Sequence, residues 1–302
     1  METRELLSTP SMLPLFVRAG AAMVPGASNL PLVGGFVAGG GGDVPELALV
    51  LGDVTIDPDR LTAYSRVCGF DLRGVLPATY PHVLAFPLQL SLMTDASFPF
   101  PAVGLVHIYN RITQHRPVRT SETLQITVSA TPLEDHPRGQ QFSLLSEVRV
   151  ADELVWEEVS TNLKRGAAGG REDAGIPGAE LPSAADLPAT ATWTLPGDLG
   201  RRYGSVSGDL NPIHMHPLSA RVFGFKSAIA HGMWTKARCL AALGARLPDA
   251  FTVEVAFKKP ILLPGEVQFC EAAGPGEAFT VQFGVRDPRK GGSHLEGLAF
   301  AA

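Results

Sequence analysis

The sequence predicts an α+β protein made of two domains of the same type. With 302 residues, the chain has the length of about two domains and is long enough to bury a substantial core. Predicted strands follow predicted helices in runs instead of alternating with them, which favours an α+β class over a parallel βαβ sheet. The same order of predicted elements occurs twice along the chain, although the amino-acid sequence itself does not repeat.

The first elements are read from turn residues and hydrophobic runs. Residues 1–44 are rich in Pro and Gly and are expected to form an irregular leader. A strand is expected over Glu46–Val54. Asp57 then has the residue type of a helix N-cap, and Pro58 suits the first helical position. This helix should end at Gly69.

A second helix is expected over His82–Met93, an apolar run that contains Pro87. A proline inside a helix removes one backbone hydrogen bond and costs about 3 kcal/mol. We therefore expect the helix to bend or break near Pro87. Alternating segments after it predict four strands, over Gly104–Gln114, Glu122–Ala130, Gln140–Val150 and Glu153–Lys164.

Residues 165–190 are rich in Gly, Ala and Pro and are expected to be a linker between the domains 45–164 and 191–302. A helix over Leu195–Ser207, an excursion over Asp209–Ile229 and a helix over His231–Ala245 should follow. Four further strands are predicted over Phe251–Lys259, Glu266–Ala273, Glu277–Arg286 and His294–Phe300.

Composition excludes several functional classes. The net charge is −5 and no run of five basic residues occurs, so nothing indicates a nucleic-acid partner. No apolar segment reaches the roughly 18 residues of a membrane span. The cysteines Cys68, Cys239 and Cys270 are far apart and lack metal-site spacing, so we expect no disulfide, no metal and a cytoplasmic location.

The most informative stretch runs from Tyr203 to Leu243. It contains Asp209 and His214, a carboxylate and an imidazole five positions apart, which form a usable acid/base pair. Pro212 between them disfavours helical geometry at the preceding residue, so an irregular loop is expected. Further along, Gly232 precedes an apolar run, where a backbone N–H near a helix N-terminus stabilises developing negative charge.

The string Y-x-x-x-S-G-D-x-N-P-x-H, followed by A-H-G-M, resembles the MaoC-like family of (R)-specific enoyl-CoA hydratases and 3-hydroxyacyl-thioester dehydratases. The resemblance covers roughly residues 190–302. It implies a hot-dog fold, in which an antiparallel sheet wraps around one long helix. The repeated order of elements resembles the double hot-dog members, so residues 45–164 should form a non-catalytic, acyl-binding domain. No metal or redox cofactor is implied.

The resemblance assigns roles to four residues. Asp209 and His214 carry the acid/base chemistry, Asn211 orients the pair through its side-chain amide, and the Gly232 N–H donates to the thioester oxygen. Alternatives remain open, because Asn211 also suits a plain Asn-Pro turn and Gly232 also suits a close approach of helix and sheet. For His231 a structural role is favoured over a catalytic one.

Substrate contacts are expected in two places. Ala85, Phe86 and Pro87 border the expected bend, where a long acyl tail has room, and Lys258 and Lys259 suit the phosphates of CoA. The expected partner is an acyl-CoA or acyl carrier protein thioester, with a homodimer as the possible assembly. Two rival functions stay open, a hot-dog thioesterase and a non-catalytic acyl-CoA-binding subunit.

Overall fold

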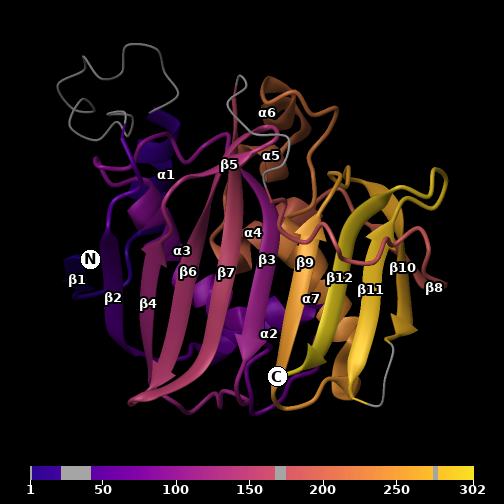
Figure 1. Ribbon diagram of the computed structural model, residues 1–302, viewed down its shortest axis with the longest axis horizontal. Helices are drawn as coiled ribbons and strands as arrows, with labels where there is room; N and C mark the ends of the chain where they lie inside the picture. The colour runs from indigo at the N-terminus through magenta and orange to yellow at the C-terminus, as the bar shows by residue number, and fades with distance from the viewer. Residues whose placement is uncertain (1, 22–41, 167–174, 275–277) are drawn as a thin grey trace. The chain divides into compact units, whose positions relative to one another are not determined.

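A computed structural model describes residues 2–21, 42–166, 175–274 and 278–302 of the chain. The chain divides into two compact units. Unit 1 comprises Met1–Thr55, His82–His107 and Thr123–Ile176, and unit 2 comprises Ile56–Pro81, Ile108–Glu122 and Pro177–Ala302. Each unit combines a mostly antiparallel sheet with helices (Figure 1), which confirms the predicted α+β class.

The sheet of unit 1 has the strand order β1-β2-β4-β6-β7, and β5 pairs with β6. β1 and β2 are parallel, and the other pairs are antiparallel. Along β4, buried residues alternate with more exposed ones, as expected of a sheet with one covered face. The strands are β1 (Glu2–Leu6), β2 (Leu47–Val54), β4 (Leu124–Ala130), β5 (Glu134–His136), β6 (Gly139–Val150) and β7 (Glu153–Arg165).

The long helix α3 (Tyr80–Met93) continues through Pro87 without interruption. The predicted break is therefore wrong, while a bend stays a prediction. Ala85 and Leu88 beside the proline are fully buried. Their packing offsets the lost backbone hydrogen bond, because burying one large aliphatic side chain contributes about 1.5–3 kcal/mol.

The first residues of the chain differ from the irregular leader that the composition predicts. Residues 2–6 form β1, and Met12–Ala21 form the helix α1. β1 is an added edge strand that hydrogen-bonds in parallel to β2, a tertiary contact that local composition does not reveal. The glycine run Gly39–Gly42 lies mostly outside the described residues.

The sheet of unit 2 has the order β3-β9-β12-β11-β10-β8, with every neighbouring pair antiparallel. Its bounds confirm the predicted C-terminal strands to within about three residues. The strands are β3 (Val106–Gln114), β8 (Ala189–Leu195), β9 (Phe251–Phe257), β10 (Gly265–Ala273), β11 (Thr280–Arg286) and β12 (Ser293–Ala301).

The helices of unit 2 confirm the predicted caps. α2 starts at Pro58, its N-cap Asp57 accepts hydrogen bonds from two backbone N–H groups, and it stops at Gly69, whose φ is 84°. The central helix α7 starts at Gly232, one residue after the predicted start at His231. The helices are α2 (Pro58–Cys68), α4 (Leu199–Ser207), α5 (Pro212–Met215), α6 (Pro217–Val222), α7 (Gly232–Leu243) and a 3-10 turn over Gly244–Arg246.

β8 is absent from the prediction, which places the end of the linker and the start of a helix over these residues. The segment Ala189–Leu195 instead pairs with β10 as an edge strand, and α4 begins only at Leu199. Thr and Trp, which favour strands, explain the preference of this segment. The last of the boundaries between the two units falls at 176/177, within the expected linker 165–190. Two segments of the expected first domain 45–164, Ile56–Pro81 and Ile108–Glu122, belong to unit 2.

The three cysteines are free and buried. Within the described ranges, no helix has both the length and the apolar character needed to cross a membrane.

Candidate active site

The segment that follows α4 carries two of the expected site residues on ordered turns. α4 ends at Gly208, whose φ is 85°, and Asp209 comes directly after it. Asn211 caps α5, Pro212 occupies its first position, and His214 lies within this short helix. The expected irregular loop is thus wrong in part, because Pro212 starts a helical turn as readily as it prevents one.

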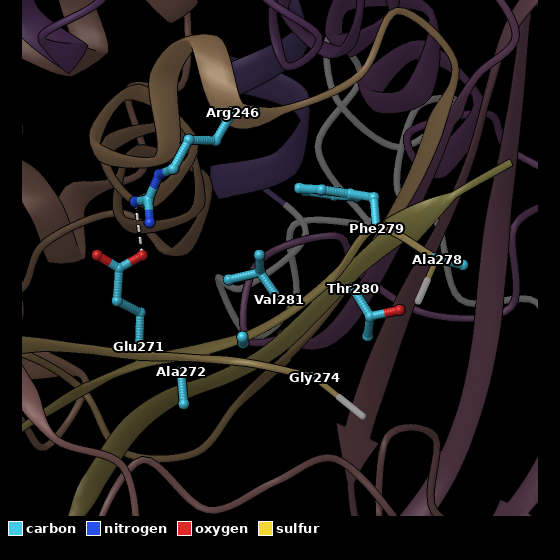
Figure 2. Close-up of a pocket in the computed structure, with 9 residues that line it drawn as sticks. Arg246, Glu271, Ala272, Gly274, Ala278, Phe279, Thr280 and Val281 are labelled. Carbon is cyan, nitrogen blue, oxygen red and sulfur yellow. Dashed lines mark hydrogen bonds and ion pairs between the residues drawn. The ribbon is translucent and has the colours of Figure 1, made fainter. Parts of the chain in front are cut away.

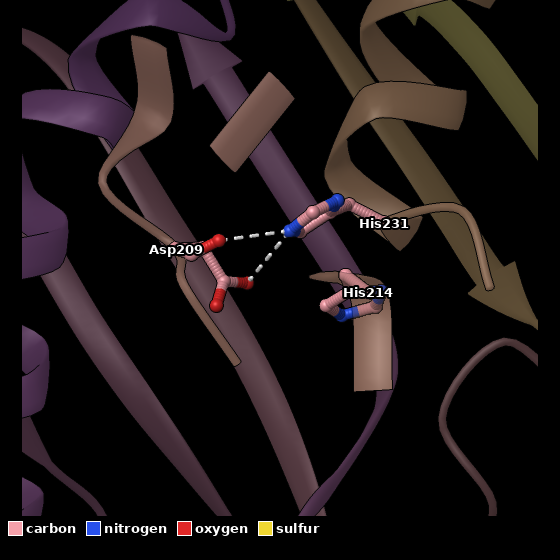
Figure 3. A group of neighbouring side chains, drawn as sticks. All are labelled: Asp209, His214 and His231. Atoms are coloured by element: carbon pink, nitrogen blue, oxygen red, sulfur yellow. Dashed lines mark hydrogen bonds and ion pairs between the residues drawn. The ribbon is translucent and has the colours of Figure 1, made fainter. Parts of the chain in front are cut away.

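Asp209, His214 and His231 come together in unit 2 (Figure 3). Each offers one ligand-type atom, and these atoms all lie within 4.8 Å of one another. The His214 and His231 residues are 8% and 2% exposed, whereas the Asp209 side chain is 29% exposed. The cluster therefore consists of a partly exposed carboxylate and two buried imidazoles.

The protonation pattern of His214 follows from one contact. Its Nδ1–H donates to the Ile229 carbonyl at 2.8 Å. In a neutral ring this leaves Nε2 with its lone pair, ready to accept a proton. Burial lowers the pKa of His214, with the Asp209 carboxylate acting in the opposite direction. His214 is therefore a neutral base near pH 7.

His231 is part of the cluster, which the structural role favoured by the sequence does not anticipate. Its Nε2–H donates to the Asp209 carbonyl at 3.0 Å and lies 3.7 Å from the Asp209 carboxylate. Its ring stacks on His214 with 3.6 Å between centroids, and Tyr203 packs against it at 4.9 Å. Burial, with a further contribution from His214, lowers the pKa of His231 to about 3. A neutral His231 thus fixes the backbone of Asp209.

Asn211 contacts Asp209 through its backbone. The Asn211 N–H donates to the Asp209 carboxylate at 3.1 Å, while the side-chain oxygen of Asn211 caps α5 by accepting from Ile213 N–H at 3.4 Å. Orientation of the pair through the side-chain amide, as the resemblance implies, is not the contact that the structure contains. Asn211 holds the carboxylate in place by its main chain.

Gly232 is the first residue of α7, next to His231. The N–H groups of a first helical turn have no carbonyl partner within the helix, so they are suited to an oxyanion. A Cβ on Gly232 would lie 2.9 Å from the Phe257 ring, so close packing of α7 on β9 also requires a glycine. Both interpretations raised by the sequence are compatible with this geometry.

Two glycines of α4 hold the loop close to the helix, and the sequence analysis missed both. A Cβ on Gly200 would lie 2.0 Å from the His214 carbonyl oxygen, and one on Gly204 would lie 2.9 Å from that of Asp209. Residues four apart share one helix face. The two glycines, four residues apart and just before the acid/base string, are the feature of the sequence that could have predicted this close approach.

The expected substrate-binding residues belong to other elements than the acid/base cluster. Ala85, Phe86 and Pro87 belong to α3 in unit 1. Lys258 forms an ion pair of 2.9 Å with Glu296, and the Lys259 carbonyl accepts from His294 at 3.1 Å. A pocket of about 560 Å³ lies between the 3-10 turn and the β10–β11 hairpin (Figure 2). None of the predicted residues lines it, and its Arg246 is paired with Glu271 at 2.6 Å.

The cluster could hold a metal ion by its spacing alone. However, the ring nitrogen of His231 that faces Asp209 donates its hydrogen to a carbonyl, and the stacked imidazoles lie face to face. A metal ligand needs that nitrogen deprotonated and its lone pair aimed at the ion. The arrangement therefore fits hydrogen-bonded acid/base groups better than a metal centre.

Comparisons with known proteins identify the family of the chain. Residues 181–274 match the model of the MaoC like domain. The chain is 35% identical over 289 residues to 3-hydroxyacyl-thioester dehydratase X of Mycobacterium tuberculosis, covering 96% of this chain and 98% of that protein. The chain belongs to the MaoC-like family. This confirms the resemblance drawn from the acid/base string.

Solved structures extend the agreement to the fold. The crystal structure of HtdX of Mycobacterium tuberculosis superposes with a TM-score of 0.74 at 34% identity, covering 84% of this chain and 100% of that one. A MaoC-like dehydratase from Phytophthora capsici shares the fold, with a TM-score of 0.69 at 19% identity over 85% of this chain and 95% of that one. This MaoC-like protein thus has the expected hot-dog fold.

Proposed function

We propose that this chain is a hydro-lyase that dehydrates (R)-3-hydroxyacyl thioesters, or in reverse hydrates trans-2-enoyl thioesters. The observation that carries the proposal is the close approach of Asp209 and His214, with a free lone pair on His214 Nε2. Family membership and the name of the Mycobacterium tuberculosis relative support the same reaction type.

Dehydration needs two proton transfers. One group removes the proton on the carbon next to the thioester, and the other protonates the hydroxyl that leaves as water. Asp209 and His214 each carry out one of these transfers. Each has an atom that can bind a proton, and the two atoms lie within 4.8 Å of each other. Charge that develops on the thioester oxygen is stabilised by the N–H of Gly232 at the start of α7.

We assign the remaining parts as follows. Unit 1 is a non-catalytic domain that binds acyl chains, and the substrate is carried by CoA or acyl carrier protein, with Lys258 and Lys259 near the carrier phosphates. The protein works as a homodimer in a reducing compartment such as the cytoplasm, in keeping with its three free cysteines.

The test is an assay on trans-2-enoyl-CoA substrates of increasing length, followed by loss of the conjugated thioester absorbance. We expect hydration of at least one chain length. Release of free thiol from a saturated acyl-CoA at a comparable rate would instead identify a thioesterase. Binding of every enoyl-CoA without turnover would identify a non-catalytic binding subunit.

A further inference from the structure

Unit 1 contains a buried polar cluster between its central helix and its sheet. His82 and Gln89 of α3 meet Ser146 of β6 and Glu158 of β7. All four residues are buried, and the Glu158 side chain is 0% exposed. Neither the acid/base chemistry of unit 2 nor the predicted substrate contacts use any of them.

The contacts within this cluster define which groups donate hydrogen bonds and which accept them. His82 Nδ1 lies 2.8 Å and 3.0 Å from the two oxygens of Glu158, so the ring donates its Nδ1–H to the carboxylate. Gln89 uses both hydrogens of its amide, donating to Glu158 at 3.0 Å and to Ser146 at 3.0 Å. Ser146 and Glu158 are also directly opposite each other in the β6–β7 register. The carboxylate is thus fixed by two side chains of one helix.

The second ring nitrogen of His82 takes no part in these contacts. His82 Nε2 has no hydrogen-bond partner among the described residues. It is also not among the described side-chain atoms that are both fully buried and without a partner. The His82 side chain keeps 10% exposure, in contrast to the enclosed Glu158. The carboxylate that holds one ring nitrogen therefore leaves the other nitrogen able to bind a ligand group.

Stability alone does not account for this arrangement. Burying a carboxylate is costly, and replacing a buried ion pair by apolar residues of similar volume is often neutral or stabilising. Most other residues of α3 are apolar, and Val83, Ala85 and Leu90 among them are buried. A purely hydrocarbon ligand would gain nothing from a polar group placed here.

We propose that His82 Nε2 is a specificity site in unit 1 for an acyl chain that carries a hydroxyl group. A hydroxyl suits the site in either protonation state of the ring, because it donates to neutral Nε2 and accepts from protonated Nε2–H. The inference rests on the proposed acyl-binding role of unit 1. Glu158 and Gln89 are positioning residues that act through His82.

Binding of saturated acyl-CoAs tests this without turnover, so it is separate from the hydration assay. Hexadecanoyl-CoA is compared by calorimetry with derivatives that carry one hydroxyl at successive positions beyond carbon 3, because the 3-hydroxy compound is the proposed substrate of unit 2. One neutral hydrogen bond gives roughly a threefold to tenfold gain in affinity. We expect this gain for one narrow range of hydroxyl positions in the unaltered protein.

The double variant His82→Phe with Glu158→Leu removes both partners, which avoids an unpaired buried carboxylate and protects folding. It should bind plain hexadecanoyl-CoA normally and lose the preference for the hydroxylated derivative. Val128→Ala, a buried change on β4 of the same unit, is the control and should keep the preference. Equal binding of plain and hydroxylated chains by the unaltered protein, or a preference that survives in the double variant, overturns the proposal.

Discussion

Replacing Gly200 with alanine tests how closely the acid/base loop must lie on α4. The new Cβ would be 2.0 Å from the His214 carbonyl oxygen, which is backbone and cannot rotate away. To reach ordinary contact near 3.4 Å, α5 must retreat by roughly 1.4 Å. Displacement of a catalytic group by about 1 Å can cost about 10²-fold in rate.

The loss of stability should be small enough for the variant to fold. Overpacking costs about 1–3 kcal/mol, while alanine gains up to about 1 kcal/mol over glycine in a helix interior. We therefore expect a folded Gly200→Ala variant with about 100-fold lower kcat and a free energy of unfolding reduced by about 0–2 kcal/mol.

The measurements are kcat in the enoyl-CoA hydration assay and the urea unfolding midpoint of the same preparation. Gly74→Ala is the matched control, because a Cβ there meets nothing within 4 Å, and it should keep both values. A folded Gly200→Ala variant with unchanged kcat would refute the claim that α4 sets the position of His214.

Three further changes test other parts of the site. Because burial lowers the pKa of His231 from 6.5 to about 3, the unfolded chain takes up a proton first as the pH falls below 6.5. His231 alone should therefore contribute a drop in stability of up to about 1.4 kcal/mol per pH unit between pH 6 and pH 4. In urea titrations His231→Leu should reduce the dependence of stability on pH, while the exposed His115→Gln should not. Dialysis against a chelator should leave hydration unchanged, and activity that is lost and then regained with zinc would indicate a metal centre instead. Gly232→Ala should lower activity because its Cβ would lie 2.9 Å from the Phe257 ring, and Phe257→Leu in the same chain should restore part of it; no recovery would show that the N-terminus of α7 is disturbed for another reason.

The predictions that succeeded depend on local chemistry. The cap at Asp57 and Pro58, the stop at Gly69 and the start of α7 to within one residue all follow from residues adjacent to the element that they delimit. The string around Asp209 and His214 likewise brings its two main groups together within a few residues.

The predictions that failed needed information from distant parts of the chain. β1 and β8 are edge strands whose partners lie far away in sequence, and α3 continues through Pro87 because buried neighbours support it. The contact of His231 with His214 and Asp209 was not predicted at all, because it depends on where α7 packs and the sequence around His231 does not contain that information.

The most direct test of the acid/base assignment is a double-mutant cycle in the hydration assay. Asp209→Asn and His214→Ala should each leave a folded protein with turnover reduced by about 10²–10⁴-fold. Because the two groups act as one unit, the double variant should be little slower than the slower single variant. Wild-type turnover in either single variant, or losses that simply multiply in the double variant, would contradict the assignment.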